Sequence, residues 1–337
     1  MPAVSVIMPA YNVDRYIAES IESVLAQTFS DFEIVIVNDG STDGTLEIAE
    51  RYRSEHPDRI VVISQENRGL SGARNTALRH ASGEVFALLD SDDCWLPTFL
   101  AEQMKILDGQ PDVALVTGNA FNRGGARDGE PVQPVPDTRP APDAAQILSD
   151  ETAVFIMSVF RRQVFDRIGG FDEHFRTNED YDFWIRAALA GFRFARNPAP
   201  LGRYRRHASS LSASEPRMIA GILRVYRKAL SSCAPGSVEQ GITKQQIERF
   251  ETELLVAEAR AALESRNAEA ALTAVSGLRR RRGGIPLRVF DLALRRTPSL
   301  ALWAYHARRQ LRHLPGAIAA PVRRKLLRLP FLPSTAM

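Results

Sequence analysis

Short apolar runs and helical apolar patterns alternate along the first 120 residues of the chain. The apolar runs, rich in Val, Ile and Leu, cover residues 4–9, 32–39, 60–65, 85–90 and 113–117. Continuous runs of this kind are typical of strands that are buried on both faces of a parallel sheet. Between them Ile17 and Ile21 begin a helical pattern, and further helices are predicted from Leu46, after a cap at Ser71, and over 96–107. This alternation predicts a doubly wound α/β layer.

The pattern changes in the next part of the chain. Residues 122–143 contain five prolines and three glycines, which predicts a surface loop. One helix and two short strands are then predicted over residues 181–189, 192–197 and 201–206. After Glu215 only helical patterns remain, and they include a helical hairpin that turns at Asn267.

The composition is that of an ordinary globular protein, because 45% of the 337 residues are hydrophobic and 25% are charged. It excludes a disordered or low-complexity chain. Two cysteines, Cys94 and Cys233, cannot form a disulfide framework, which favours a reducing cytoplasm. We expect neither a signal peptide nor a membrane-spanning helix, because the sequence lacks the basic flank and the long apolar stretch that these need.

Polar or turn-forming residues follow four of the predicted strands. They are Pro9-Ala10-Tyr11-Asn12, Asn38-Asp39-Gly40-Ser41, Glu66-Asn67-Arg68-Gly69 and Asp90-Ser91-Asp92-Asp93. In open α/β sheets the functional groups gather beyond the carboxyl ends of the strands. Each group alone could be a helix cap or a turn, but the four together predict a binding site at one rim of the sheet.

The last of these groups places three carboxylates within four residues, at Asp90, Asp92 and Asp93. Their charges repel one another unless a cation or hydrogen-bond donors offset them. Oxygen ligands of this kind suit Mg²⁺ or Mn²⁺, which keep waters and share the phosphates of a substrate. The alternative is a cluster that caps the helix predicted after it.

Four motifs stand in one order along this half of the chain, at residues 4–12, 36–43, 67–75 and 89–95. Their residues and spacing resemble those of the family-2 glycosyltransferases, and the similarity extends over roughly residues 3–211. The resemblance implies the GT-A fold, an α/β fold whose Rossmann-like, mostly parallel sheet is flanked by helices. In this chain an α-helical C-terminal extension would follow. It also implies an inverting transferase that uses a nucleotide-diphosphate sugar with Mn²⁺ or Mg²⁺.

The resemblance implies a role for each residue of the predicted rim. Tyr11 would lie against the nucleotide base, and Asp39 would accept a hydrogen bond from the uracil imide. Because a carboxylate only accepts, it fits uracil or thymine, and UDP is the expected nucleotide. Arg74 would contact the base or the diphosphate, Asp90 the ribose, and Asp92 the cation. The full donor-binding set is Pro9, Tyr11, Asp39, Arg74, Asp90, Ser91 and Asp92.

A second acidic motif, Glu179-Asp180, precedes a predicted helix. Direct displacement at the anomeric carbon needs one base for the acceptor hydroxyl proton, and the family position indicates Asp180 as that base. Glu179 or Asp182 would support it. The acceptor-side residues are expected to be Gly170, Phe171, Asp182 and Trp184. The alternative is that these acids only stabilise the positive end of the helix dipole.

Residues 204–212 resemble the family's late loop, which folds over the donor. In this loop His207 could ligate the metal or touch the diphosphate, and Arg205 or Arg206 could pair with phosphate. The expected metal ligands are Asp92 and His207. A lone exposed histidine with no such function is the alternative.

The C-terminal part of the chain is strongly basic. Residues 279–337 hold 14 Arg or Lys and one acid, Asp291. A helix is expected to begin at Pro298, with an apolar stripe that contains Leu300 and Trp303. Basic amphipathic helices of this kind bind anionic membrane surfaces, although a helical cap on the catalytic domain is an alternative. No nucleic-acid-binding motif is present, so nucleic acid is not an expected partner.

Together these observations predict a catalytic domain over 1–214, a helical region over 215–278 and a basic amphipathic tail over 279–337. The catalytic domain would hold a nucleotide-sugar half (1–121), the loop (122–143) and an acceptor half (144–214). We expect a cytoplasmic enzyme, peripheral on the inner face of the cell membrane, that serves polysaccharide biosynthesis of the cell envelope. It would transfer a sugar to a hydroxyl of a glycan or a lipid-linked glycan. A nucleotidyltransferase and an inactive sugar-nucleotide or glycan-binding module are the alternatives.

Overall fold

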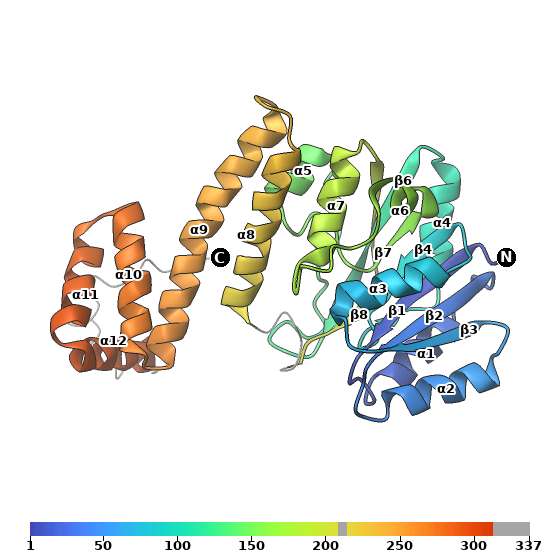
Figure 1. Cartoon of the computed structure of the whole chain (residues 1–337), viewed down its shortest axis with the longest axis horizontal. Coiled ribbons are helices and arrows are strands. Elements are labelled where there is room, and N and C mark those ends of the chain that lie inside the picture. Colours follow the sequence, from blue (N-terminus) through green and yellow to red (C-terminus); the bar gives the residue numbers. More distant parts are fainter. Residues whose placement is uncertain (208–213, 313–337) are drawn as a thin grey trace. The chain divides into compact units, whose positions relative to one another are not determined.

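The computed structural model describes residues 1–207 and 214–312. Within these residues lies an eight-stranded sheet of order β3-β2-β1-β4-β7-β6-β8-β5 (Figure 1). The strands are β1 (Val4–Ala10), β2 (Phe32–Asp39), β3 (Ile60–Gln65), β4 (Val85–Leu88), β5 (Cys94–Trp95), β6 (Val113–Arg123), β7 (Ser158–Arg161) and β8 (Arg193–Arg205). β5 and β7 run antiparallel to their neighbours, and the remaining strands share one direction. The predicted α/β class with a mostly parallel sheet is confirmed.

Helices flank this sheet and make up most of the chain between residues 215 and 312. The helices before residue 207 are α1 (Ile17–Leu25), α2 (Thr45–Glu55), α3 (Gly69–His80), α4 (Phe99–Gly109), α5 (Ala144–Ser149), α6 (Arg162–Ile168) and α7 (Glu179–Leu189). The later helices are α8 (Glu215–Ser232), α9 (Val238–Glu264), α10 (Ala268–Arg282), α11 (Ile285–Arg296) and α12 (Pro298–Arg312). The predicted helical extension is thus confirmed, with Asn267 as the N-cap of α10 and α12 beginning at Pro298.

Three local predictions were wrong. The two strands predicted over 192–197 and 201–206 form the single strand β8, because β6 pairs with it along its length. The same pairing carries β6 two residues into the predicted loop 122–143 and ends it at Arg123. Ser71 lies inside α3 and does not cap it, since that helix begins at Gly69.

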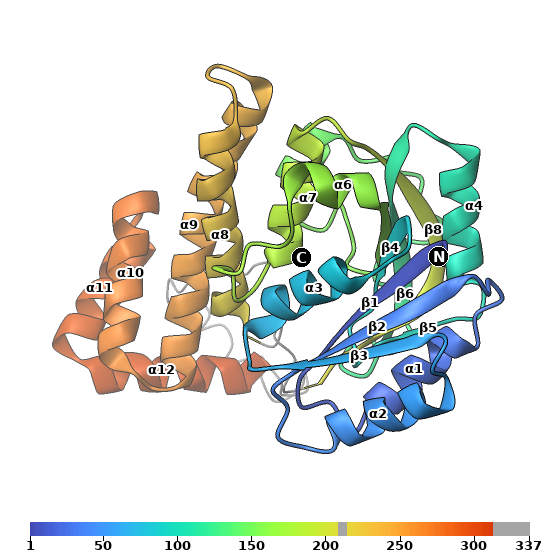
Figure 2. The same ribbon diagram turned by 45° about the vertical axis from the view of Figure 1, so that its right-hand side comes forward.

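The alternation of side chains along β1 divides the core of the sheet into two layers. Val4, Val6 and Met8 are fully buried in a cluster that also contains Ile17 of α1 and Phe99 of α4. On the opposite side of β1 and β2 lies α3, as Figure 2 shows. Each fully buried side chain of this size contributes about 1.5–3 kcal/mol of transfer free energy, so apolar burial fixes the layers.

The strand register brings the predicted motifs to one rim. Because β1, β2 and β3 are parallel, Ala10 pairs with Asn38, and Asp39 pairs with Gln65. The carboxyl end of β4 follows at the same rim, beside β1. Residues that follow these strands in sequence therefore meet in space.

The chain divides into two compact units. The first consists of Met1–Ala213 and Arg224–Gln246 and contains the sheet, whereas the second consists of Ser214–Leu223 and Ile247–Met337. The described residues of the second unit are helical, and their buried cluster includes Leu263, Val275, Phe290 and Leu294. Among the described residues, no helix combines the length and the apolarity that a passage through a bilayer demands.

Candidate active site

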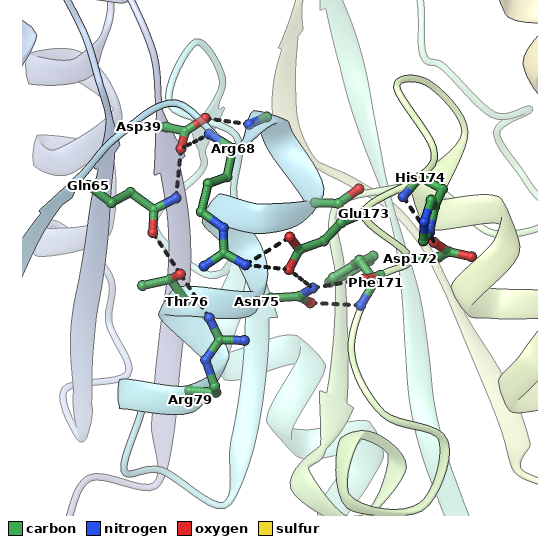
Figure 3. Close-up of polar contacts among 12 residues, drawn as sticks. Asp39, Gln65, Arg68, Asn75, Thr76, Arg79, Phe171, Asp172, Glu173 and His174 are labelled. Atoms are coloured by element: carbon green, nitrogen blue, oxygen red, sulfur yellow. Dashed lines mark hydrogen bonds and ion pairs between the residues drawn. The ribbon is translucent and has the colours of Figure 1, made fainter.

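The carboxylate of Asp39 is fixed by the first turn of α3 (Figure 3). Its Oδ1 accepts hydrogen bonds from Gln65 Nε2 at 2.6 Å and from the backbone N–H of Arg68 at 2.9 Å, and its Oδ2 accepts the N–H of Gly69 at 2.8 Å. Gly69 has φ +79°, a conformation that favours glycine. A carboxylate has about four lone-pair positions, so these three bonds leave about one acceptor position on Oδ2, in a side chain that is 2% exposed.

Tyr11 stands just beyond the carboxyl end of β1, and half of its surface is exposed. Pro9, two residues earlier, uses its carbonyl to accept a hydrogen bond from Ser91 Oγ at 2.7 Å. Ser91 is buried, so its hydroxyl joins the ends of β1 and β4. Of these three donor-side residues, Tyr11 alone presents a large exposed side chain.

Arg74 links two acidic motifs that are far apart in the sequence. Its guanidinium is 1% exposed and binds Glu179 Oε1 at 2.5 Å through Nη1 and Asp90 Oδ1 at 2.6 Å through Nη2. Burial alone would lower the pKa of Arg74, but the charges of Asp90 and Glu179 raise it above its ordinary value. Because the guanidinium is bound on both sides, Arg74 connects the two acidic motifs. It is not free to contact a base or a diphosphate, as the sequence had suggested.

The acidic run after β4 holds three carboxylates in different surroundings. Asp90 pairs with Arg74, and Asp93 is buried and accepts the backbone N–H of Arg205 at 2.7 Å. Asp92 Oδ2 lies 3.0 Å from Nε2 of His207. Burial raises the pKa of Asp92, and the charge of Asp90 raises it further. The alternative of a capping cluster is wrong, because α4 has Thr98 at its N-cap and no side-chain cap.

Asp92 and His207 are the two expected metal ligands, and the structure brings them together. Their side chains are 26% and 19% exposed, so a ligand from solvent can reach both. A carboxylate oxygen and an imidazole nitrogen suit Mn²⁺, and two protein ligands leave room for phosphate oxygens and waters. The described residues contain no group of three or more potential ligands. The pair thus fits a cation that is shared with a substrate, and not one that the protein encloses.

Tyr16, the N-cap of α1, and Glu19 within α1 contact Arg205 and His207. The sequence did not indicate a role for either residue. The ring of Tyr16 stacks on His207 with centroids 5.1 Å apart, and the guanidinium of Arg205 lies 4.6 Å from the centre of the same ring. Glu19 Oε2 pairs with Arg205 Nη2 at 2.7 Å across 186 residues of chain. Only the fold reveals such a contact, because no local pattern connects segments so distant.

The second acidic motif forms the first turn of α7. Glu179 is buried against Arg74, whereas Asp180 is partly exposed and accepts the N–H of Tyr181 at 2.8 Å. Burial raises the pKa of Asp180, although the nearby charge of Arg74 opposes this shift. Asp182 is 3% exposed, and its oxygens pair with Arg186 at 2.8 Å and Lys228 at 2.7 Å. Of the three acids, Asp180 alone has no direct ion pair among the described residues.

The segment before α7 is attached to α3 by Asn75 (Figure 3). Asn75 accepts the N–H of Phe171 and donates to its carbonyl, both at 2.8 Å. A Cβ on Gly170 would lie 2.2 Å from Asn75 Oδ1, so this contact requires glycine. Phe171 and Trp184, expected on the acceptor side, are 3% and 1% exposed and pack around Phe183. Phe171, Trp184 and Asp182 are therefore buried residues that pack beneath the site, and their side chains are not exposed to an acceptor.

Comparison with known proteins agrees with this arrangement. Residues 5–169 match the family described as Glycosyl transferase family 2, and residues 146–238 match Glycosyltransferase like family 2. EpsE of Bacillus subtilis strain 168, named as a glycosyltransferase, is 35% identical over 198 residues, which cover 57% of this chain and 69% of EpsE. The chain belongs to glycosyl transferase family 2. This membership supports sugar transfer.

Other proteins are similar over shorter or longer parts of the chain. The glycosyltransferase GlyA of Streptococcus pneumoniae serotype 4 is 44% identical over 121 residues, 35% of this chain, and the chain spans only 17% of GlyA. S. aureus TarS (residues 1–349) is 22% identical with a TM-score of 0.59 over 91% of both chains. The mannosyltransferase PcManGT of Pyrobaculum calidifontis, solved with GDP-Man and Mn²⁺, is 23% identical with a TM-score of 0.58, over 97% of this chain and 88% of its own. These two likenesses show that the family-2 chain has the GT-A fold.

Proposed function

We propose that the protein is an inverting, metal-assisted glycosyltransferase that moves a sugar from a nucleotide diphosphate, UDP first, to a hydroxyl of a glycan or lipid-linked glycan. The observation that carries the proposal is the pair of contacts from Arg74 to Asp90 and Glu179. These contacts tie the acidic run at the rim of the sheet to the start of α7. They bring a candidate donor site and a candidate base into one site.

The nucleotide end of the donor would bind beside Asp39. Its carboxylate is oriented by backbone N–H groups of α3 and accepts without donating, which matches the imide N–H of uracil. Tyr11, exposed at the end of β1, would lie against the base. S. aureus TarS has been solved with UDP and with UDP-GlcNAc, which makes UDP the first nucleotide to test.

The chemical step is one displacement at the anomeric carbon. The acceptor hydroxyl oxygen forms a bond to that carbon while the bond from the carbon to the diphosphate oxygen breaks. We assign removal of the hydroxyl proton to Asp180, because it is the acid of α7 that is partly exposed and lacks an ion pair among the described residues. Glu179 would hold Arg74 and Asp180 in place.

Asp92 and His207 would hold Mn²⁺ or Mg²⁺ together with the diphosphate. A bound cation of this kind supplies neutralisation of the negative charge that develops on the leaving group. Arg205 would keep Asp92 in position, since its Nε donates to the Asp92 carbonyl at 2.7 Å, and Tyr16, which contacts both Arg205 and His207, would position the second ligand. The Mn²⁺ complex of PcManGT supports the choice of cation to test.

The proposal also covers organisation and location. Residues 1–214 would form the catalytic domain, with 215–278 as a helical region and 279–337 as a basic tail. Attachment of this tail to an anionic membrane would make the protein peripheral on the inner face of the cell membrane, where lipid-linked glycans are available as acceptors.

A nucleotide screen followed by a product assay tests the proposal. Unfolding temperature is measured with UDP, GDP, CDP and dTDP, each with and without Mn²⁺, because a ligand of the folded state raises that temperature. The expected result is the largest rise with UDP and Mn²⁺, followed by turnover of a UDP-sugar to a product of inverted anomeric configuration by NMR. Absence of any nucleotide effect would contradict the proposed donor site.

A further inference from the structure

Exposed apolar side chains are concentrated in the second unit. Ten large hydrophobic residues are exposed in the described part of the chain, and five of them fall between residues 285 and 303. On α11 these are Ile285, Val289 and Leu292, with exposed fractions of 75%, 49% and 48%. Their spacing of four and three residues places them on one face of the helix. The opposite face is buried through Phe290 and Leu294, so α11 is apolar on two sides.

Arginines accompany this outward face. Arg288 and Arg296 stand three residues after Ile285 and four after Leu292, so they lie beside the same stripe. Among the described residues neither arginine has an acidic partner, and the same is true of Arg280 and Arg282 at the end of α10.

Asp291, the one acid among residues 279–337, does not offset the positive charge of these arginines at the surface. Asp291 is 2% exposed, hydrogen-bonds Ser276 and pairs with Arg295 at 3.0 Å. The surface between residues 279 and 307 is therefore basic without an exposed acid.

The next helix also carries exposed apolar side chains. Leu300 and Trp303 of α12 are 59% and 64% exposed and, three residues apart, share a face. The other two tryptophans of the chain, Trp95 and Trp184, are 3% and 1% exposed. Trp303 is thus the tryptophan that meets solvent.

We propose that the outward face of α11, with Leu300 and Trp303 of α12, is the surface through which the protein docks on an anionic phospholipid membrane. We call Ile285, Arg288, Val289, Leu292, Arg296, Leu300 and Trp303 the docking face. Apolar side chains enter the boundary of the acyl chains while arginines reach the phosphates, and both kinds of contact are available here. A second copy is a poor occupant, because a twofold interface would bring these unpaired arginines together.

This inference deepens the proposed membrane location and rests on that part of the proposed function. The full-length protein is mixed with vesicles of phosphatidylcholine alone or with phosphatidylglycerol, and bound protein is separated by flotation. We expect binding to the anionic vesicles, and a decrease of about tenfold or more in the partition coefficient for the double variant Val289→Glu, Leu292→Glu. Arg288→Gln with Arg296→Gln should also weaken binding, and it should reduce the sensitivity of binding to salt.

The matched control is Val238→Glu, which changes a 69% exposed apolar residue at the start of α9. It should bind as the unchanged protein does. Insertion into the vesicle should shift the emission of Trp303 to shorter wavelength, and brominated acyl chains should quench that emission. Trp303→Phe should remove both effects.

Three outcomes would overturn the docking face: no flotation with anionic vesicles, equal flotation of the Val289→Glu, Leu292→Glu variant, or bound protein whose Trp303 is not quenched. Absence of flotation, combined with a molecular mass that rises with protein concentration, would indicate that a second copy occupies this face.

Sugar transfer to a soluble acceptor is measured in parallel and should be the same for every variant. Its absence in the unchanged protein would contradict the proposed chemistry and leave the flotation result standing.

Discussion

Arg74 of α3 and Glu179 of α7 form an ion pair in the core of the first unit. Arg74 Nη1 lies 2.5 Å from Glu179 Oε1, and the two side chains are 1% and 5% exposed. The same guanidinium binds Asp90 at the end of β4. A single side chain therefore links Asp90 and Glu179, two acids that lie far apart in the sequence.

We expect Arg74→Ala to destabilise the protein by about 3–5 kcal/mol, because two carboxylates would stay close to each other without their cation. Urea unfolding followed by far-UV circular dichroism measures this. Arg51→Ala is the control, since Arg51 and Glu55 form a pair whose side chains are 58% and 54% exposed. Such a surface pair contributes about 0–1 kcal/mol. Equal losses in the two variants would show that Arg74 does not hold the motifs together.

Asp180→Asn should lower kcat by about 10²-fold or more while donor affinity is retained, because an amide cannot take the acceptor proton. Turnover and nucleotide titration measure the two effects separately. Asp166→Asn on the exposed surface of α6 is the control. Near-normal turnover of Asp180→Asn would move the base to Glu179 or Asp182.

The same residue predicts a pH dependence. Burial raises the pKa of Asp180 above its ordinary value. Since only the ionised carboxylate acts as a base, kcat/KM should fall as the pH is lowered through that raised pKa. A pH profile of the residual activity of Asp180→Asn should lack this acid limb. A profile with the same limb would assign it to another group, for which Glu179 is the neighbour with a raised pKa.

Asp92→Asn should abolish the metal-dependent part of UDP binding while the fold persists. An amide is a weaker ligand for a hard cation than a carboxylate, and Asp92 is one of two side chains that can reach it from this rim. Calorimetric titration of UDP with Mn²⁺ and with EDTA measures the difference. Asp108→Asn, an exposed change on α4, should preserve it. Unchanged affinity with Mn²⁺ in Asp92→Asn would remove Asp92 from the ligands.

Gly170→Ala should destabilise the protein by about 1–3 kcal/mol, because the added methyl group would overlap the amide of Asn75. The displaced amide would release the backbone of Phe171, so KM for the acceptor should rise if this segment borders the acceptor. Gly109→Ala, whose Cβ would meet nothing within 4 Å, is the control for both measurements. A stable Gly170→Ala variant with unchanged kinetics would show that the segment adapts.

Periodicity predicted the first parallel strands and the helices between them well, because residues buried on both faces of a sheet must be apolar whatever surrounds them. It did not predict β5, α5, β7 or α6. It predicted β1, β2 and β3 to within one residue and the start of α12 at Pro298. It failed at β8, where Pro198 and Pro200 interrupt the apolar pattern while pairing with β6 keeps the strand continuous. Pairing partners, and not local composition, decide such a strand.

The sequence by itself determined the fold class, the family and the rim to which Asp39, Asp90 and Asp92 belong, because the succession of elements along the chain and the spacing of the motifs can be read from the linear sequence. Only the tertiary structure decided which of these groups is open and which is bound. Arg74 looks like a free cation in the sequence, yet it is enclosed by two carboxylates that the fold delivers from distant segments. Tyr16 and Glu19 carry no motif and still hold His207 and Arg205. Burial and ion pairing depend on which residues the fold brings next to a side chain, and a linear pattern contains no information about those neighbours.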